Sequence, residues 1–598
     1  MCGIVGYAGS EDIAQDVLLE GLYSLEYRGY DSAGVAVPGP DVQVCKRAGE
    51  VEALDRALAE ESPLETRIGI GHTRWSTHGP PLDENAHPHT DSDERVAVVH
   101  NGIIENYQSL RDKLTDSGVA FSSDTDTEVV PHLIGQYLEA GFDEERAFRT
   151  AIDRLEGSYA IAAVFAEGDA IYGTRQDSPL VLGLGEESNY LASDVPAFIE
   201  HTDQVVYLED GTFARIDAES MSVTDGDGNP LQMDVKTIDW DPEEAGKSGY
   251  DHYMLKEIND QPTALRQCLR GRVDELDGIV TFEDLDGLSS GEFVQFVACG
   301  TSYHAAMFGA QLLRAREIRA TATLASEYTP ESAVIDEDTL VVGVTQSGET
   351  ADTLRALRCA NRLGARTLAV TNTVGSTAAR ECDHALYIRA GPEIGVAATK
   401  TFASQQVALA LVATHLADSP DRETIQPLRD LPGQVQTVLD TSQARLVAEV
   451  FRDAEAYFFI GRGLLYPTAL EGALKMKEIT YKHAEGFAAG ELKHGPLALV
   501  TEETPVFAPV IGNGEAARKT IGNVKEVEAR GAPVVAVTDG KSDVERYADA
   551  VLEVPESDQI AGSVLANVQL QLVAYWVANE LGRSIDRPRN LAKSVTVE

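Results

Sequence analysis

The first 240 residues show short apolar runs separated by glycines and polar turns, a pattern typical of β-strands. These runs are CGIVGYA, GVAVP, IGIGHTRW, VAVVHNGII and SYAIAAVFA, which begin at residues 2, 34, 68, 96 and 158. Residues 13–29 and 127–141 instead repeat apolar residues at helical spacing. We therefore expect residues 2–239 to form one domain of mixed strands and helices.

A polar segment separates this domain from the rest of the chain. Aspartates and glycines accumulate at 216–230, and DWDPEEAGKSG at 239–249 has little periodicity of either kind. We place an interdomain linker at residues 240–252.

From residue 288 onward the order strand, turn, helix recurs, and the whole pattern occurs twice. The matched segments, first copy against second, are 293–306 with 456–469, 340–353 with 506–518, 367–372 with 534–539, and 384–391 with 549–556. Such βα units imply two doubly wound parallel sheets whose ligands bind at the carboxyl ends of the strands. We assign the sheets to residues 288–430 and 448–585, and a C-terminal tail to 586–598.

The charge of the chain excludes some functions. With 97 acidic and 49 basic residues the net charge is −48, the opposite sign to that of a nucleic-acid-binding protein. The acidic residues are dispersed, so they repel one another across the compact state when salt is low. We hypothesise a high-salt cytoplasm; the alternative is a merely acidic mesophilic protein.

The cysteines and the hydropathy of the chain argue against further classes of protein. The 6 cysteines contain no CxxC pair, which argues against a disulfide framework and a structural zinc site. Residues 3–9 are apolar but no basic region precedes them, so we expect no signal peptide. No uninterrupted run reaches the roughly eighteen apolar residues that a membrane span needs. We expect a soluble cytoplasmic protein that binds neither nucleic acid nor membrane.

The amino terminus carries a candidate nucleophile. Removal of Met1 before the small side chain of Cys2 would leave a thiol and a free α-amine on one residue. A free cysteine has a pKa of about 8.5, and an α-amine with a pKa of about 7.7–8.0 can accept the thiol proton near neutral pH. Cys2 would then need no histidine as its base. The alternative is a cysteine that follows the start codon by chance.

Three further segments of the first domain carry groups that suit glutamine. Arg74, in RWSTHG (74–79), can hold a carboxylate bidentately. The amide of Asn101 beside the N–H of Gly102 forms a candidate oxyanion hole. Asp126, in SDTDTE (123–128), can bind an amine. Taken separately, each also fits an ordinary role: a stacked arginine, an Asn-Gly turn or a helix N-cap.

A cluster of histidines raises the alternative of a metal site. The histidines are at positions 72, 78, 87, 89 and 100. Their spacing fits neither a helical HExxH pair nor a closed ligand set, so we expect no metal.

Together these motifs resemble the glutaminase domain of class II amidotransferases, which use an N-terminal cysteine. The segments that carry the resemblance are MCGIVGYAG, EYRGYDSAG, RWSTHG, HNGIIENY and SDTDTE. The resemblance implies a four-layered α/β/β/α sandwich, with Cys2 as nucleophile through its own amine and Asn101 and Gly102 as oxyanion stabilisers. It further implies that Trp75 gates the passage of ammonia and that glutamine is bound by Arg74, Thr77, His78 and Asp126.

In the second half, TQSGET (345–350) follows a predicted strand and opens a predicted helix. Its hydroxyls, its glutamine side chain and the N–H groups freed by Gly348 would converge on an anion, and a dianionic phosphate suits them. CGTS (299–302) adds two hydroxyls in the same repeat. The segment is not a P-loop, because GxxxxGK[ST] is absent. The alternative is a helix N-terminus capped by Ser347 or Thr350.

Lysine is scarce in this composition, yet lysines recur in dense motifs. In EGALKMKE (471–478), Glu471, Lys475 and Glu478 fall on one helical face, which is either a reactive cluster or a solvated ion-paired face. His494 lies in a glycine-flanked loop, GELKHGPLAL (490–499). Lys593 lies in an otherwise apolar segment, and a desolvated lysine can form a Schiff base with a ketone.

With HYMLKEINDQP (252–262) and GVAATKTF (395–402), these motifs resemble the isomerising glutamine:fructose-6-phosphate aminotransferases over nearly the whole chain. The resemblance implies two sugar-isomerase (SIS) domains. It implies sugar-phosphate contacts from Thr301, Ser302, Thr345, Gln346, Ser347, Thr350, Val396 and Ala592. Thr345 stands where the family often has serine, and its hydroxyl is retained.

The same resemblance implies roles for four residues in the sugar reaction. His494, supplied by the neighbouring subunit, would open the sugar ring, and Lys593 would form the imine. Glu478 would move the proton between C1 and C2, with Lys475 assisting. We expect a homodimer that uses glutamine and fructose 6-phosphate, passes ammonia internally and needs no cofactor. The rivals are another class II glutamine amidotransferase, such as the phosphoribosyl-pyrophosphate type, and a non-catalytic sugar-phosphate sensor.

Overall fold

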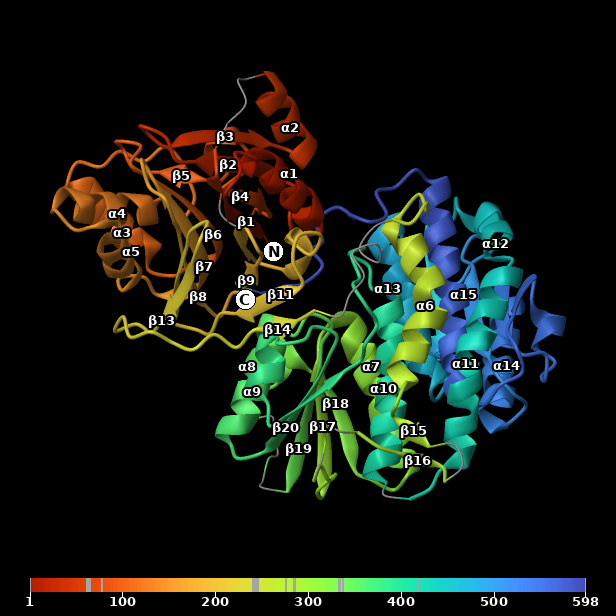
Figure 1. Cartoon of the computed structure of the whole chain (residues 1–598). Coiled ribbons are helices and arrows are strands. Elements are labelled where there is room, and N and C mark those ends of the chain that lie inside the picture. Colours follow the sequence, from red (N-terminus) through yellow and green to blue (C-terminus); the bar gives the residue numbers. More distant parts are fainter. Residues whose placement is uncertain are drawn as a thin grey trace. The chain divides into compact units, whose positions relative to one another are not determined.

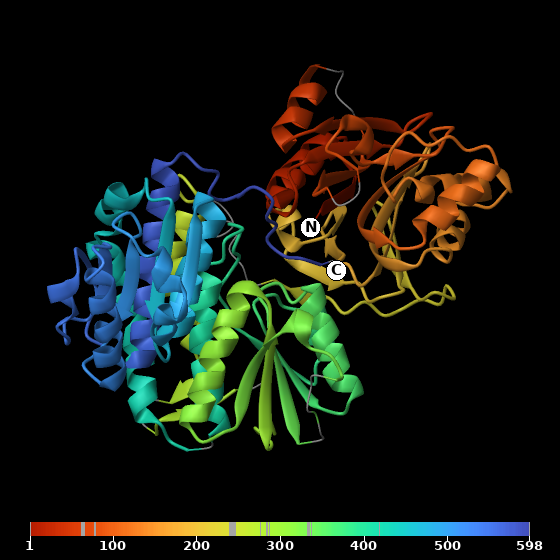
Figure 2. The same cartoon turned by 180° about the vertical axis from the view of Figure 1, so that it is seen from behind.

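The computed structural model describes residues 2–60, 66–76, 79–238, 247–274, 277–282, 285, 287–331, 335, 338–417 and 419–596. The chain divides into two compact units. Unit 1 contains residues Met1–Pro242 together with the terminal segment Ala592–Glu598, and unit 2 contains Glu243–Leu591. Figures 1 and 2 show the two units from opposite sides.

Unit 1 is built on two antiparallel sheets. The larger one runs in the order β14 (Lys236–Thr237), β11 (Gln204–Tyr207), β9 (Val181–Leu184), β10 (Ser188–Ala192), β1 (Gly3–Gly9), β4 (Ile68–Arg74), β2 (Ser32–Val37) and β3 (Gln43–Ala48). The smaller one runs in the order β13 (Met221–Thr224), β12 (Phe213–Ile216), β8 (Ile171–Gln176), β7 (Gly157–Phe165), β6 (Val96–Ile104) and β5 (His89–Thr90).

Helices cover the outer faces of both sheets. The helices of unit 1 are α1 (Ala14–Leu25), α2 (Val51–Glu60), α3 (Tyr107–Asp116), α4 (Val129–Glu139) and α5 (Glu144–Ile152). Alternation along β6 explains the layering, since side chains of a strand point alternately to its two faces. Ala97 and Val99 join the core between the sheets, whereas Val96 and Val98 pack against the layer of α3, α4 and α5. The predicted α/β/β/α sandwich is confirmed (Figure 1).

Unit 2 contains two parallel five-stranded sheets of the same strand order. The first runs β18 (Ala320–Leu324), β17 (Phe293–Ala298), β19 (Thr339–Val344), β20 (Arg366–Thr371) and β21 (His384–Tyr387). The second runs β23 (His483–Ala488), β22 (Ala456–Gly461), β24 (Val506–Val510), β25 (Val534–Thr538) and β26 (Ala550–Glu553). A two-stranded ribbon, β15 (Val273–Asp274) and β16 (Ile279–Val280), stands apart from both. The four repeats read from the sequence fall on matching strands, so the predicted duplication is confirmed.

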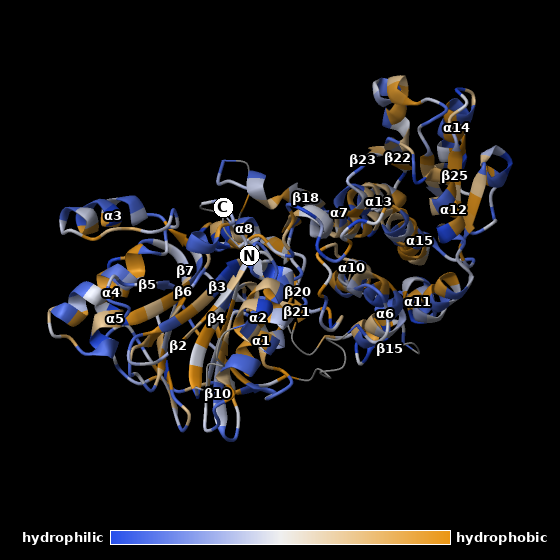
Figure 3. Ribbon diagram, turned by 90° about the horizontal axis from the view of Figure 1, so that it is seen from above, coloured by the Kyte–Doolittle hydropathy of each residue, from blue (hydrophilic) through white to orange (hydrophobic). Residues whose placement is uncertain are grey.

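The helices of unit 2 flank these sheets. They are α6 (Tyr253–Leu269), α7 (Gly300–Ala315), α8 (Ala351–Arg362), α9 (Thr377–Glu381), α10 (Lys400–Leu416), α11 (Arg422–Thr441), α12 (Ala444–Phe451), α13 (Leu465–Thr480), α14 (Glu515–Glu528) and α15 (Gln559–Glu580). One apolar core extends through both halves of unit 2 and includes Phe296 of β17, Phe459 of β22 and Tyr575 of α15. Figure 3 shows apolar colouring along α13 and α15.

Helix α15 is long and apolar enough, by length and composition, to cross a membrane, with a mean hydropathy of 1.3 in its most apolar window. However, 89% of that window is buried inside the protein. Asn567, Gln569 and Gln571 interrupt the apolar sequence of this continuous helix, so a search for uninterrupted apolar runs does not find it. Its composition is that of a central core helix, which is apolar on all sides because all sides are buried.

Candidate functional site

Cys2 lies directly before β1, at the edge of a cavity in unit 1. The antiparallel register pairs Gly3 with Thr73, which sets Cys2 beside the end of β4. The Trp75 N–H points at the Cys2 Sγ atom from 3.2 Å. Burial raises the pKa of the thiol, while this N–H and the nearby Arg74 and Arg28 oppose that effect. The surroundings thus contain donors and positive charge that would stabilise a thiolate once it forms.

Asn101 and Gly102 lie within β6 and face the same cavity. The Asn101 side chain donates from Nδ2 to the Cys2 carbonyl oxygen at 2.9 Å. Gly102 has φ +123°, and a Cβ there would lie 2.0 Å from the backbone oxygen of Ser158. Only glycine fits this position, because a Cβ would clash and the positive φ favours glycine. The predicted pair of oxyanion donors is therefore brought next to the predicted nucleophile.

The cavity next to Cys2 has a volume of about 80 Å³. Its lining, all within unit 1, comprises Cys2, Arg28, Trp75, Asn101, Gly102, Ser178, Pro179, Ala592, Ser594, Val595 and Thr596. Trp75 packs edge-on against Tyr30, with ring centroids 5.5 Å apart. The terminal segment that contains Lys593 thus forms one wall of the cysteine site.

Arg74 and Asp126 are both buried in unit 1. Arg74 ends β4 and donates to the Gly79 carbonyl at 3.3 Å, and burial lowers the pKa of its guanidinium. Asp126 accepts from the backbone N–H of Ile104, at the end of β6, at 2.8 Å. Thr77 and His78, the other predicted glutamine contacts, lie outside the described residues.

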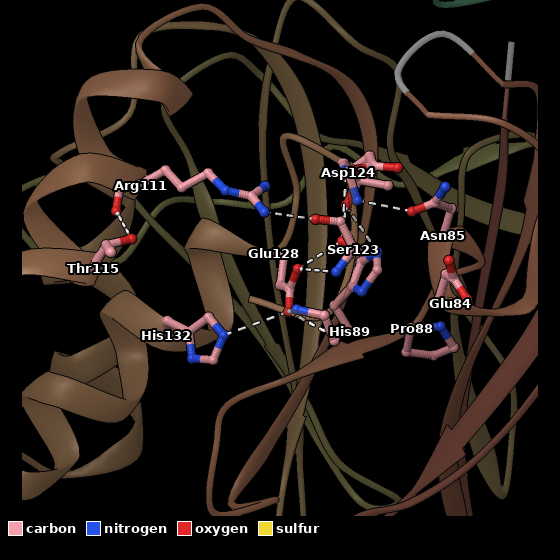
Figure 4. Close-up of polar contacts among 12 residues, drawn as sticks. Glu84, Asn85, Pro88, His89, Arg111, Thr115, Ser123, Asp124, Glu128 and His132 are labelled. Atoms are coloured by element: carbon pink, nitrogen blue, oxygen red, sulfur yellow. Dashed lines mark hydrogen bonds and ion pairs between the residues drawn. The ribbon is translucent and has the colours of Figure 1, made fainter. Parts of the chain in front are cut away.

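A network of hydrogen bonds fixes the loop that carries Asp126 (Figure 4). Glu128 accepts from the backbone and hydroxyl of both Ser122 and Ser123 at 2.7–2.8 Å. Burial alone would raise the pKa of the Glu128 carboxyl, but His132, whose Nε2 atom lies 3.7 Å away, and the donors of the two serines hold it well below its ordinary value. Asn85 accepts from the Asp124 N–H at 2.9 Å on the opposite side of the loop. Glu128, not assigned a role from the sequence, therefore acts as the anchor of this segment.

The predicted phosphate loop connects β19 to α8. The Thr345 hydroxyl accepts from the Gly348 N–H at 3.1 Å, and the Ser347 hydroxyl accepts from the Glu349 N–H, also at 3.1 Å. Gly348 has φ +71°, a left-handed conformation that favours glycine. Thr350 is the N-cap residue of α8 and lies 3.3 Å from the Thr345 hydroxyl. The loop is a compact turn of hydroxyls and N–H groups at a helix N-terminus, as an anion site requires.

Except for Ala592, which is grouped with unit 1, the other predicted sugar-phosphate contacts lie on elements of unit 2. The Ser302 hydroxyl, on α7, accepts from Gln405 Nε2 of α10 at 3.0 Å. The backbone oxygen of Gln346 accepts a hydrogen bond from the Asn372 N–H at 3.1 Å. The Val396 N–H donates to the Asp586 carbonyl at 3.0 Å, which ties its loop to the segment after α15.

A buried cluster of charges joins α7 to α13. Lys475 lies 2.6 Å from Glu478 and 3.4 Å from Glu471, so the predicted shared helical face is confirmed. The Lys475 ammonium also donates to the Thr301 hydroxyl at 3.1 Å, and that hydroxyl donates to Glu471 at 3.0 Å. Lys475 and Glu471 are completely buried, which excludes a solvated ion-paired face.

The pKa values of the two carboxyl groups in this cluster are shifted in opposite directions. Burial would raise the pKa of Glu471, but the charge of Lys475 and the contacts from His304 and Thr301 outweigh it and lower the pKa. Burial raises the pKa of Glu478, helped by the negative charge of Glu471. Burial would lower the pKa of Lys475, but the two carboxylates raise it. Opposed shifts in neighbouring carboxyl groups are the arrangement expected of a proton-transfer site.

His494 ends a 3-10 helix (Ala489–His494) of unit 2 and is exposed. No contact in the described part of the chain joins it to the cluster of Glu471, Lys475 and Glu478. Lys593 is half-buried in the terminal segment grouped with unit 1. Across the described residues, no three or more His, Cys, Asp or Glu side chains are grouped so as to hold a metal ion.

The structure adds three residues to which the sequence assigned no role. Arg28 donates from Nε to the Cys2 carbonyl at 3.2 Å and pairs with Asp194 at 2.7 Å. His304, one turn beyond Thr301 on α7, contacts Glu471 at 2.7 Å through Nδ1. His72 contacts the Asn101 side chain at 3.1 Å. Arg28 and His304 occur inside the motifs EYRGYDSAG and CGTSYHAA, but their spacing alone does not reveal their contacts.

Two domain families match the chain. The family described as SIS domain matches residues 288–415 and 450–581. The family described as Glutamine amidotransferase domain matches residues 72–200. The first covers both five-stranded sheets of unit 2, and the second covers strands of both sheets of unit 1.

Several relatives match over their full length. The chain is 52% identical to "Glutamine--fructose-6-phosphate aminotransferase [isomerizing]" of Halobacterium salinarum, with 100% of both chains covered. It is 49% identical to the protein of the same name from Symbiobacterium thermophilum, again over 100% of both. Among solved structures, the C-terminal domain of glucosamine-fructose-6-phosphate aminotransferase from Francisella tularensis aligns with a TM-score of 0.53 at 37% identity. That alignment covers 57% of this chain and 100% of the other.

Proposed function

Because the chain belongs to the isomerising glutamine:fructose-6-phosphate aminotransferases, we propose how its residues divide the reaction of that family. The enzyme transfers the amide nitrogen of glutamine to fructose 6-phosphate and isomerises the sugar. The products are glucosamine 6-phosphate, an amino sugar, and glutamate.

The first step is nucleophilic attack by Cys2 on the side-chain amide of glutamine. With Met1 removed, the α-amine of Cys2 takes the thiol proton and later gives it to the leaving nitrogen. The oxyanion is stabilised by the Asn101 amide and the Gly102 N–H. Ammonia leaves, and water hydrolyses the thioester to glutamate. Arg74 and Asp126, with Thr77 and His78, bind the carboxylate and amine of glutamine.

The released ammonia must stay out of bulk water, where it would be protonated at neutral pH and lose its nucleophilicity. The cavity beside Cys2 supports internal transfer, since Trp75, Ala592 and Val595 supply apolar parts of its wall. Lys593 follows Ala592 directly in the chain. The segment that receives ammonia at the cysteine therefore also carries the amine proposed to hold the sugar.

The second step is sugar isomerisation with amination. His494 of the neighbouring subunit opens the ring, and Lys593 condenses with the C2 ketone to an imine, releasing water. Ammonia then displaces the Lys593 amine from this imine and takes its place at C2. Glu478 moves a proton from C1 to C2 of the resulting sugar imine, a role supported by its raised pKa, and Lys475 neutralises the charge that develops. The phosphate is bound by Thr301, Ser302, Thr345, Gln346, Ser347 and Thr350, while Val396 and Ala592 line the sugar.

Two further features belong to this proposal. The exposed position of His494 suits a group supplied to the site of a second subunit, so we propose a homodimer. The acidic composition and the Halobacterium salinarum relative support a cytoplasmic enzyme adapted to high salt.

The observation that carries the proposal is the single cavity that holds Cys2, Asn101 and Gly102. The test supplies amide-labelled nitrogen-15 glutamine and fructose 6-phosphate to wild type and to Cys2→Ala, and identifies the products by mass spectrometry. Wild type should give labelled glucosamine 6-phosphate. The variant should lose glutamine hydrolysis but aminate the sugar when free ammonia is supplied.

Cys45→Ala, a buried cysteine of β3, is the matched control and should behave as wild type. Glutamine turnover that persists in Cys2→Ala would refute the nucleophile assignment. A parallel reaction contains phosphoribosyl pyrophosphate in place of fructose 6-phosphate. Formation of a phosphoribosylamine there, with no amino sugar from fructose 6-phosphate, would refute the sugar assignment.

A further inference from the structure

We propose that His72 is a positioning residue for glutamine hydrolysis: its ring N–H fixes the Asn101 side-chain amide with the nitrogen facing Cys2. The proposal rests on the proposed oxyanion role of Asn101. His72 is not among the glutamine contacts or catalytic groups described above, and it touches neither substrate nor the thiol. It acts only through the amide.

The contacts of His72 determine its proton. The ring lies on β4 and is completely buried. Its Nε2 atom lies 3.0 Å from the His100 carbonyl oxygen and 3.1 Å from Asn101 Oδ1. Both neighbours are hydrogen-bond acceptors, so Nε2 must carry the proton that is shared between them. The tautomer of His72 follows from this geometry.

The same contact determines the orientation of Asn101. With Oδ1 held by His72, Nδ2 donates to the Cys2 carbonyl at 2.9 Å. A flipped amide would set its NH₂ group against the His72 N–H and its oxygen against the Cys2 carbonyl oxygen. Both contacts would be repulsive inside a buried site, where each lost hydrogen bond is costly. His72 therefore selects the rotamer that presents N–H groups on the side of the thiol.

The surroundings of the ring keep it neutral and in place. Burial lowers the pKa of His72 to about 3, so the ring remains neutral throughout the working range of a thiolate enzyme. Within the described residues, Nδ1 is buried and has no hydrogen-bond donor or acceptor beside it. The His87 ring packs over it, with centroids 4.3 Å apart. A protonated ring would have to bury an unsatisfied N–H at Nδ1, so a single N–H remains, shared between Asn101 Oδ1 and the His100 carbonyl.

A purely structural role makes different predictions from a positioning role. A histidine that only fills space would affect stability and would lower every activity of unit 1 in proportion to unfolding. A histidine that orients an oxyanion donor would lower kcat for glutamine hydrolysis and leave glutamine binding intact, because the donor strengthens only as the oxyanion forms.

The test uses the full-length enzyme with His72→Leu, His72→Gln, Asn101→Ala and the double variant His72→Leu/Asn101→Ala. Glutaminase kcat and KM are measured, with the affinities for glutamate and for the γ-aldehyde analogue of glutamine, which forms a tetrahedral adduct with a thiol. Amination of fructose 6-phosphate by free ammonia in the same samples reports the folding of unit 2, and pulse proteolysis with detection of fragments from unit 1 reports the folding of unit 1. His201→Leu is the matched control, since His201 pairs with Glu20 and stacks on Tyr190 in the same unit.

We expect His72→Leu to lower glutaminase kcat by about 10–100-fold, less than the 10²–10³ that loss of a whole oxyanion donor costs. Affinity for the aldehyde should fall by a similar factor, with glutamate affinity unchanged. His72→Gln, which keeps an N–H donor, should recover most of the loss. The double variant should be no slower than Asn101→Ala, because His72 acts through that amide.

The inference is overturned if His72→Leu hydrolyses glutamine at the wild-type rate. It is also overturned if the fold-losses in glutaminase kcat of His72→Leu and Asn101→Ala multiply in the double variant. A matching loss of glutamate affinity, or of folded unit 1, would also overturn it in favour of a structural role. If Asn101→Ala itself retains wild-type turnover, the proposed oxyanion role has failed. That result differs from failure of the His72 step alone, in which only the Asn101 variant is slow.

Discussion

The buried histidines make unit 1 labile to acid, and His72 allows the effect to be calculated. In the unfolded chain its pKa is the ordinary 6.5, whereas burial lowers it to about 3 in the folded protein. Between these values the unfolded chain binds a proton that the folded chain does not, so stability falls as the pH falls from 6.5 towards 3. Above pH 6.5 the contribution is fully present.

The size of this loss in stability follows from the linkage between proton binding and unfolding. For one group with these two pKa values, the free energy of unfolding falls by about 2 kcal/mol between about pH 7.5 and about pH 5.0. Burial also lowers the pKa of His87 and His89 well below the ordinary value, so they act in the same direction. The charge of His72 is one cause of the lowered pKa of both neighbours, so removing it should shrink their contributions as well.

The assay is urea unfolding of the full chain at both pH values and constant high salt, followed by pulse proteolysis with detection of fragments from unit 1. In His72→Gln the loss between the two pH values should be smaller than in wild type by about 2 kcal/mol or more, because the contributions of His87 and His89 shrink as well. His72→Leu should shrink the loss equally, although its stability at neutral pH differs, because both variants remove the same titration. An unchanged loss in both variants would refute the reasoning.

Three further predictions follow from other parts of the structure. Glu478→Gln keeps the size of the side chain but removes its proton transfer, so fructose 6-phosphate amination should fall by about 10²–10⁴ while glutamine hydrolysis persists; separate assays of the two products decide this. Gly348→Ala would place a Cβ 2.1 Å from the Ser376 hydroxyl at φ +71°, so calorimetry should show sugar-phosphate affinity reduced by about tenfold or more. Gly364→Ala, at φ +89° with nothing within 4 Å of the new Cβ, should leave that affinity unchanged. The net charge of −48 predicts that the midpoint of thermal unfolding rises between about 0.1 M and about 2 M KCl, and a constant midpoint would contradict adaptation to salt.

Much of the fold could be read from periodicity, because apolar spacing reports directly which faces are buried. The strands β1, β2, β4, β6 and β7 and the duplicated βα units were predicted in this way, whereas β3, β5 and β8–β14 were not. Periodicity does not state which strands pair, so the division of unit 1 into an eight-stranded and a six-stranded sheet comes only from the structure. The position of the terminal segment that contains Lys593 also depends on long-range packing, which periodicity does not report.

In the candidate site, too, the sequence predicted the local contacts but not the long-range ones. Helical spacing alone was enough to place Glu471, Lys475 and Glu478 on one face. The contact of His304 with Glu471 joins α7 to α13 across a separation of 167 residues, and no local pattern encodes it. His72 was visible from sequence only as one of several histidines, because its role depends on the pairing of β4 with strands whose register the sequence does not state.

The central claim is that Cys2 reacts as the amino-terminal residue of the mature chain. Mass spectrometry of the active enzyme, mixed briefly with glutamine and quenched in acid, tests it most directly. The predicted result is an amino-terminal peptide that begins at Cys2, with a free α-amine and a γ-glutamyl thioester on its sulfur. A fully active enzyme that retains Met1, or a thioester found on another cysteine, would contradict the account.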